Sequence, residues 1–372
     1  MTLTWRDGVI TEIKPSSSTL SEDLWFAPGL VDLQINGFGG VDFQHDGLTE
    51  SELLQASRAL RSAGCARFLL TLVTDRWESL LARVAHLRTL RSESDELSSA
   101  IAGWHIEGPF LSSEPGYCGA HDPTLMCNPT PDLIRQLRVL TGCDPVLVTL
   151  APERPGAFEA IVEAVKLGMR VSLGHTNASV DCLSRAIAAG ATGFTHLGNA
   201  CPQALDRHDN ILWRVLDADG LMVSLIADGI HVSPSLFRLL HRAIPVESIY
   251  YTTDAMSAAG TGPGRYQLGK LELEVGGDGV VRQLGRTNFA GSALTPFDGI
   301  FRAAKMLNRS WQKVWDGFSS RPAKWMKISH QIEVGAEATF CLVRPHCGSS
   351  SGDVTVIWRG EALAPAGASE KH

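Results

Sequence analysis

The chain lacks the long apolar segments of a membrane protein. Among its 372 residues, no apolar run approaches the ~18 residues that are needed to span a bilayer, and the densest run, Phe68–Val73, is far shorter. The N-terminal segment MTLTWRDGVI becomes charged at once and has no apolar core of the kind found in signal peptides. We therefore expect a protein that neither spans nor binds a membrane.

The sequence also lacks paired cysteine motifs. Its eight cysteines are scattered without a Cys-x-x-Cys pair. In a chain of this length, that spacing favours reduced thiols in the cytoplasm over a disulfide framework. The formal net charge of −7 argues against a nucleic-acid partner. An anionic substrate would have to be met by a local group of cations or backbone N–H groups.

A third absence concerns nucleotide binding, because no Gly-x-Gly-x-x-Gly follows any expected strand. Eight short apolar runs read as strands buried on both faces of a parallel sheet. They are Leu30–Ile35, Arg67–Val73, Ile101–Ile106, Pro145–Leu150, Arg170–Leu173, Gly193–His196, Met222–Ala227 and Ile249–Thr253. Amphipathic stretches with helical spacing alternate with them, for example Glu50–Ala63, Trp77–Leu90 and Pro234–His241. Eight alternating units favour an α/β fold of the (β/α)8 TIM-like barrel type over an open doubly wound sheet.

The two ends of the chain differ from this pattern. Residues 1–28 and 330–372 contain short β-prone pieces, and neither end can bury a core alone. We expect them to pair into one small β domain, with residues 29–329 forming the barrel. Residues 264–288 alternate in polarity and turn at GGDG, which predicts a hairpin inserted after the eighth strand.

Polar residues at the ends of the expected strands indicate the chemistry. Glu107 ends the third strand, His175 and His196 end the fifth and sixth, and Asp254 ends the eighth. In a barrel the carboxyl ends of all strands meet at one face, so these residues should converge. Two histidines and one glutamate are a common ligand set for a catalytic zinc, whose fourth position stays open for water.

Eight motifs along the chain make the resemblance specific. They are PGLVDLQINGFGG, HIEGPF, GAHDP, LGHTNA, THLGNA, ADGIHV, TTDA and AGSAL. In order and spacing the chain resembles the N-acetylglucosamine-6-phosphate deacetylase family of the amidohydrolase superfamily. The resemblance implies metal ligands at Glu107, His175 and His196, a catalytic acid/base at Asp254, and carbonyl polarisation by His121.

The same resemblance implies the remaining contacts of the site. The substrate would be a small amino-sugar phosphate, and its contacts would come from Ala120, His121, Asn199, Ala200, Arg207, His231, Phe289, Ala290 and Gly291. It also implies one divalent metal ion per subunit, with Zn²⁺ as the default, and a homodimer.

The first strand lacks the His-x-His that many related hydrolases carry, and it has Gln34 and Asn36 at those positions. Amide groups are weak zinc ligands compared with imidazole. Some members of the resembled family carry Gln-x-Asn there and use a single metal. We therefore expect Gln34 and Asn36 to orient the catalytic water or the neighbouring ligands.

Together with the residues, the resemblance implies a metal-dependent deacetylase that hydrolyses the N-acetyl amide of an amino-sugar 6-phosphate, most simply N-acetylglucosamine 6-phosphate. An N-acetylgalactosamine-6-phosphate deacetylase and another mononuclear amidohydrolase remain alternatives. Dinuclear cyclic amidases usually bridge their metals with a lysine on the fourth strand, and PVLVTLAPE has none. Adenosine-type deaminases rely on the missing His-x-His. A non-catalytic sugar-phosphate-binding barrel is a further alternative, although it would not need the acid/base Asp254.

Overall fold

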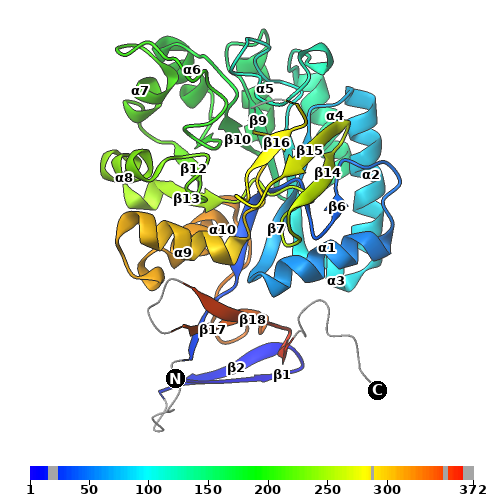
Figure 1. Ribbon diagram of the computed structural model, residues 1–372. Coiled ribbons are helices and arrows are strands. Elements are labelled where there is room, and N and C mark those ends of the chain that lie inside the picture. Colours follow the sequence, from blue (N-terminus) through cyan, green and yellow to red (C-terminus); the bar gives the residue numbers. More distant parts are fainter. Residues whose placement is uncertain (16–23, 286–288, 347–350, 363–372) are drawn as a thin grey trace.

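The structure, a computed structural model, describes residues 1–15, 24–285, 289–346 and 351–362. Its centre is an eight-stranded sheet in which every pair of neighbouring strands is parallel (Figure 1). The strands are β4 (Leu30–Ile35), β7 (Cys65–Val73), β8 (Ile101–Glu107), β9 (Val146–Leu150), β10 (Arg170–Leu173), β11 (Gly193–Phe194), β12 (Met222–Ile226) and β13 (Ile249–Thr252). Their spatial order follows the chain order throughout. This confirms the predicted barrel, because a doubly wound sheet would reverse its order at a switch point.

Helices surround the strands, as Figure 1 shows. They are α1 (Glu50–Ser62), α2 (Trp77–Glu93), α3 (Asp95–Ala100), α4 (Pro131–Thr141), α5 (Ala157–Lys166), α6 (Val180–Ala188), α7 (Ile211–Leu216), α8 (Pro234–Ala243), α9 (Pro296–Leu307) and α10 (Ser320–Met326). Side chains cap the N-termini of several of these helices. Thr49, for example, accepts the N–H of Glu52, whose carboxylate binds the Thr49 N–H in return. Short 3₁₀ turns are η1 (Pro123–Leu125), η2 (Val246–Ser248), η3 (Trp311–Lys313) and η4 (Trp315–Phe318).

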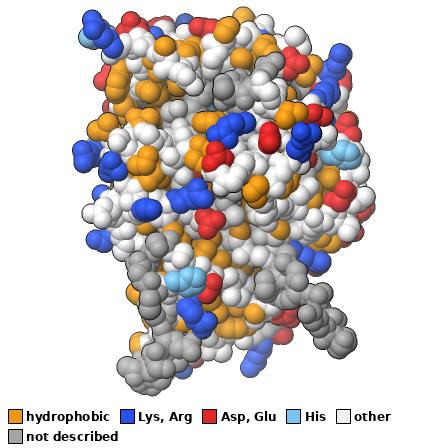
Figure 2. All heavy atoms as spheres, in the orientation of Figure 1, with side chains coloured by type: hydrophobic (Ala, Val, Ile, Leu, Met, Phe, Trp, Pro, Cys, Tyr) orange, Lys and Arg blue, Asp and Glu red, His pale blue; other side chains and the backbone are white. Residues whose placement is uncertain are grey.

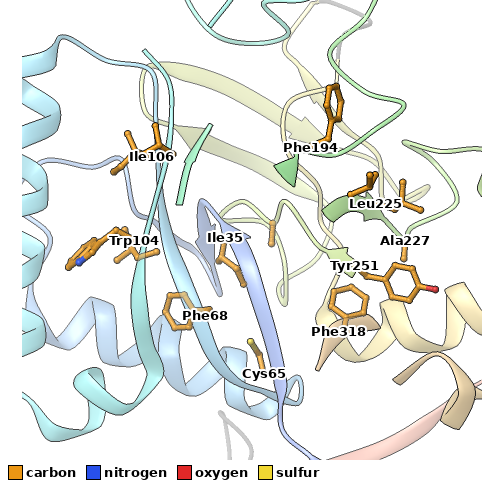
Figure 3. Packing of buried hydrophobic residues seen from close by; sticks show 14 of the residues in the cluster. Ile35, Cys65, Phe68, Trp104, Ile106, Phe194, Leu225, Ala227, Tyr251 and Phe318 are labelled. Carbon is orange, nitrogen blue, oxygen red and sulfur yellow. The ribbon is translucent and has the colours of Figure 1, made fainter. Parts of the chain in front are cut away.

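The main hydrophobic core lies between the strands and the helices. Figure 3 shows side chains such as Phe68, Trp104, Ile106 and Tyr251 pointing from the strands into this layer. Side chains of a strand alternate between its two faces. Because Trp104 and Ile106 of β8 lie in the core, His105 and Glu107 lie on the other side of the strand.

A second apolar cluster closes the end of the barrel where the strands begin. It joins early strand residues to α10 and the segment that follows, and consists of Val31, Leu33, Leu69, Leu147, Tyr250, Ala323, Trp325, Met326 and Ile328. With that end filled, the carboxyl ends of the strands are where a site can form.

The two chain ends share one sheet below the barrel (Figure 1). Strand β3 (Trp25–Pro28) pairs antiparallel with β17 (Phe340–Pro345), and β18 (Gly352–Trp358) and β19 (Glu361–Ala362) continue that sheet. Strands β1 (Thr2–Arg6) and β2 (Val9–Lys14) form a hairpin beside it. This confirms a small β domain built from both termini. Residues 16–23, 347–350 and 363–372 of the predicted domain lie outside the described residues.

The insertion after the last barrel strand has three strands instead of the two that were predicted. Strands β14 (Gly264–Leu268), β15 (Leu271–Val275) and β16 (Val281–Gln283) form an antiparallel sheet. The predicted turn joins β15 to β16, but a second reversal at Gly269 and Lys270 separates β14 from β15. That turn is too short to interrupt the alternation of the sequence. Residues 286–288, at the end of the predicted hairpin, lie outside the described residues. Elsewhere in the chain, a pair of short antiparallel strands, β5 (Gly37–Phe38) and β6 (Val41–Asp42), follows β4.

The outer surface carries charges of both signs. On the face in Figure 2, basic and acidic side chains are interspersed, with apolar side chains between them. None of the helices in the described ranges is long and apolar enough to cross a membrane.

Candidate functional site

Three buried side chains meet at the carboxyl ends of the barrel strands. Glu107 is the last residue of β8, and His175 and His196 follow β10 and β11. The Nε2 atom of His196 lies 2.9 Å from Glu107 Oε1, and that of His175 lies 3.5 Å from the same oxygen. One ligand atom from each residue lies within 4.8 Å of the other two. This spacing allows all three to bind a single ion.

The hydrogen bonding of this cluster fits a metal. His175 Nδ1 lies 2.9 Å from the carbonyl oxygen of Tyr117. A carbonyl can only accept, so Nδ1 carries the hydrogen and the Nε2 lone pair faces Glu107. Burial alone would raise the pKa of Glu107, but the neighbouring imidazoles of His175 and His196 hold it well below its usual range. Two imidazoles and an ionised carboxylate suit a divalent cation, and zinc in particular.

The backbone at these strand ends is strained. His175, His196 and Asp254 have φ values of 51°, 36° and 52°, in the left-handed region that non-glycine residues rarely adopt. Each costs of order 1–3 kcal/mol and persists only where the surrounding structure holds it. At His196, a hydrogen bond from the backbone N–H to Ser224 Oγ, at 2.6 Å, helps to stabilise this conformation. Such outliers cluster at functional sites, and here they coincide with the converging polar side chains.

The two amides of the first strand bind the carboxylates of the site. Gln34 Nε2 donates to Glu107 Oε1 at 2.8 Å and to Asp254 Oδ1 at 3.0 Å. Asn36 Nδ2 donates to the same oxygen of Asp254 at 2.7 Å. Both amides therefore fix one oxygen of Asp254. Among the described residues no hydrogen bond is made to the other oxygen, Oδ2.

Asp254 sits in an environment that favours proton exchange. Burial, reinforced by the negative charge of Glu107, raises the pKa of Asp254 to about 7, while the hydrogen bond from Asn36 acts to lower it. A cation bound beside Glu107 would offset that negative charge and lower the pKa of Asp254. A carboxyl group that titrates between its ordinary value and neutrality can both take and return a proton.

His121 lies beside the cluster as a neutral imidazole. Burial and the neighbouring His175 lower the pKa of His121 to about 3. Its Nδ1 accepts from the Thr74 backbone N–H at 3.4 Å and lies 2.8 Å from the Thr74 hydroxyl. Since Nδ1 is an acceptor, Nε2 carries the hydrogen, and Nε2 lies 4.0 Å from Glu107 Oε2. His121 thus offers an N–H donor next to the metal ligands.

Several residues that were predicted to bind substrate lie around Asp254. His231 Nδ1 is 2.6 Å from Asp228 Oδ2, and this contact fixes the ring. The ring packs edge-on against Phe289, with 5.1 Å between the ring centroids. Ala290 is buried. Gly291 has a φ of 66°, and a Cβ there would lie 3.1 Å from the carbonyl oxygen of Asp254, so this turn needs glycine.

The other predicted contact residues lie in the turn after His196, against the inserted sheet, or on the surface. The Asn199 amide donates to the His196 carbonyl at 3.1 Å, and Ala200, with a φ of 48°, continues that turn. Ala120 packs against the inserted sheet. Arg207 is exposed, and within the described ranges its guanidinium makes no hydrogen bond or ion pair. No polar contact within the described part of the chain therefore joins Arg207 to the other predicted residues.

Sequence reasoning missed the groups that orient these side chains. Thr74 fixes the tautomer of His121, and the Tyr117 carbonyl fixes that of His175. Neither carries a signal, because a hydroxyl or a carbonyl can come from almost any position. Asp228 was detectable, since it stands three residues before His231 in ADGIH.

Two relatives and one solved structure that are similar to this chain share one description. No family model matches the chain. It is 33% identical over 356 residues to N-acetylglucosamine-6-phosphate deacetylase of Mus musculus, which covers 91% of this chain and 85% of the relative. The Bacillus subtilis enzyme of the same name is 30% identical over 325 residues, covering 86% and 81%. A structure of the Mycobacterium smegmatis deacetylase, a mutant in complex with N-acetyl-D-glucosamine-6-phosphate, superposes with a TM-score of 0.86 at 29% identity, covering 97% and 94%. The chain therefore belongs to the N-acetylglucosamine-6-phosphate deacetylase family.

Proposed function

We propose that the protein hydrolyses the N-acetyl amide of N-acetylglucosamine 6-phosphate to glucosamine 6-phosphate and acetate. The observation that carries this proposal is the buried Glu107, His175 and His196 cluster, tied to Asp254 through Gln34. The names of the relatives and the sugar phosphate bound in the Mycobacterium smegmatis structure support the substrate.

Glu107, His175 and His196 would hold one divalent cation, and we propose Zn²⁺. A bound zinc ion lowers the pKa of a water molecule to about 7 and polarises a carbonyl group. The remaining steps fall to the protein's own groups. The Nε2–H of His121 donates to the acetyl oxygen, which becomes an anion as water adds to the carbonyl carbon.

Asp254 moves the proton. Its Oδ2 atom takes a proton from the attacking water, since Oδ1 is already bound by Gln34 and Asn36. The same carboxyl group then returns the proton to the nitrogen as the C–N bond breaks. Without that proton the amine would have to leave as an anion, so one residue serves both steps.

A substrate panel tests the proposal. The purified, metal-loaded protein should release acetate from N-acetylglucosamine 6-phosphate faster than from the galacto isomer or from the sugar without phosphate. Faster turnover of N-acetylgalactosamine 6-phosphate would contradict the proposed substrate but not the proposed deacetylation. Ammonia release would indicate a deaminase instead, and binding without any product would indicate a sugar-phosphate-binding barrel.

We propose that Arg207 and His231 contact the phosphate. The chain carries a net charge of −7, so a phosphate needs local cations, and the fork of an arginine suits phosphate oxygens. Arg207→Ala should raise KM for the phosphorylated sugar by about 10–100-fold, the scale of charge-assisted hydrogen bonds. It should hardly change turnover of the unphosphorylated sugar. Arg242→Ala, which removes another exposed arginine, is the control and should change neither. Equal losses on both substrates would contradict a phosphate role.

Asn36 provides a prediction about pH. Asp254 acts as a base only when it is ionised, so kcat/KM should fall as the pH drops through its pKa. The Asn36 amide lowers that pKa, so Asn36→Ala should raise it and move the acidic limb to higher pH. A lost hydrogen bond to a charged group corresponds to about one to two pH units. The rate at high pH is the internal control. An unmoved limb in a fully metal-loaded variant would argue against Asp254 as the titrating base.

Two further proposals concern the setting of the enzyme. We propose a cytoplasmic location, supported by the seven cysteines of the described ranges, all of which are free thiols. A homodimer is proposed from the family resemblance alone. Sedimentation velocity at micromolar concentration distinguishes it from a monomer.

A further inference from the structure

The barrel has a seam between its first and last strands. Strands β4 and β13 stand at the two ends of the sheet order, and no ladder pairs them. Where the two strands end, the Asn36 N–H donates to the Ala255 carbonyl at 2.7 Å, and Ile35 and Ala255 form an isolated bridge. The proposed acid/base and its amide partner both lie at this seam, because Gln34 belongs to β4 and Asp254 follows β13.

A single buried carboxylate links the two strands. Asp32 is fully buried. Its Oδ2 atom accepts the N–H of Thr253 at 2.9 Å and the Thr253 hydroxyl at 2.7 Å. Its Oδ1 atom accepts the Thr252 hydroxyl and, at 3.1 Å, the N–H of Gln34. Three of the four hydrogen bonds therefore cross the seam.

The other neighbour of β4 does not hold Gln34 in place. The register between β4 and β7 shifts between Asp32 and Ile35, which leaves an extra residue on β4. Such bulges interrupt the ladder and redirect side chains. The N–H of Ile35 accordingly donates to the Thr71 hydroxyl, at 2.9 Å, instead of a carbonyl of β7. The N–H of Gln34, within the bulge, donates to Asp32.

We infer that Asp32 is a positioning residue for the proposed deacetylation: it fixes the backbone of Gln34 and of Thr253, and so the contact between the Gln34 amide and Asp254. This inference rests on the proposed function. Closing a barrel seam alone does not require a carboxylate, since apolar side chains of similar size would close it without desolvating a charge. A carboxylate offers several acceptor sites in one place, and here they bind the residues on either side of the Gln34–Asp254 hydrogen bond.

The test uses Asp32→Asn in the metal-loaded, full-length protein. Asparagine has nearly the same size, but its NH₂ group cannot accept from both donors of Thr253. We expect kcat to fall about 10–100-fold with KM and metal content little changed, because misplacement of about 1 Å can cost 10²-fold in rate. Thr141→Val is a matched control. It removes a buried hydroxyl remote from the site, bound to the Leu137 carbonyl at 3.0 Å on α4, and should lower stability without lowering kcat.

A double-mutant cycle separates positioning from general destabilisation. If Asp32 acts through Gln34, the double variant Asp32→Asn/Gln34→Ala should lose little more kcat than the larger single loss. Losses that multiply would overturn the inference, as would native kcat in a folded, metal-loaded Asp32→Asn protein.

Two further measurements test the inference if Asp32→Asn does not fold or if the protein uses another substrate. Should Asp32→Asn not fold, Thr252→Val removes one of its hydrogen bonds and should lower kcat, while Thr252→Ser keeps the hydroxyl and should restore it. Equal kcat for the two would overturn the inference. A crystal structure of metal-loaded Asp32→Asn, or of Thr252→Val if the former does not fold, tests the geometry without substrate. We expect the Gln34 amide to have left Asp254, and an unchanged contact would contradict the inference even if the wild-type protein proved to use another substrate.

Discussion

Asp254→Asn should retain the fold and the metal while kcat falls by about 10²–10⁴-fold, the scale of general acid–base catalysis. The amide oxygen of asparagine can still accept from Gln34 and Asn36, so the side chain should stay in place. It cannot take a proton from water or return one to the amine. Steady-state kinetics, metal analysis and thermal unfolding of the same preparation measure the three quantities separately.

A second carboxylate supplies the control for this variant. Asp42 also accepts backbone N–H groups, from Gln44 at 3.0 Å and from Gly269 at 2.7 Å, but it contacts none of the proposed metal ligands. Asp42→Asn should therefore leave kcat within a few-fold of the wild type. Near-native turnover in a fully metal-loaded Asp254→Asn protein would remove Asp254 from the mechanism.

Most of the barrel was predictable because its strands are buried on both faces. Strand β9, for example, is fully buried and reads VLVTL, so an apolar run marks it without any knowledge of its neighbours. The insertion was harder. Strands β14 and β15 keep one alternating pattern across Gly269 and Lys270, and only the three-dimensional pairing shows where the chain reverses.

The site was predictable to the extent that residue type carries information. Glu107, His175 and His196 stand out because such residues are rare at buried strand ends. The bulge in β4 left no mark on the sequence, although Gln34, which contacts Glu107 and Asp254, lies within it. For Arg207, the residue type suggests a role, but residue type alone does not locate the side chain. Its charge suggests a phosphate contact, but its position depends on a loop whose conformation the sequence does not specify.

The largest expected effect concerns the metal. Removing the ion with a chelator should abolish deacetylation, and one equivalent of Zn²⁺ per chain should restore it. The prediction follows from the ligands: within the described residues, Glu107, His175 and His196 form the only group of three or more potential ligands. Without the cation, the pKa of the attacking water would stay far above neutrality, and hydroxide would be scarce at neutral pH.

The amides of the first strand explain why a second ion should not bind beside the first. In dinuclear relatives of this superfamily, imidazoles of a His-x-His would stand at the positions of Gln34 and Asn36. Here both positions present NH₂ groups toward carboxylates, at 2.8 Å from Glu107 and 2.7 Å from Asp254. An NH₂ group donates hydrogen bonds and has no lone pair suited to bind a cation. We expect these contacts to fill the space with donors and to keep both carboxylates from bridging to another metal.

Titrating the metal-free protein with Zn²⁺ while following acetate release decides the stoichiometry. Activity should rise linearly and stop at one equivalent, and the bound ion should survive gel filtration. Glu107→Gln is the matched variant, because it preserves size but removes the charge of the proposed ligand, and it should bind zinc far more weakly. A break at two equivalents, with both ions required for turnover, would show that Gln34 and Asn36 do not limit the site to one metal.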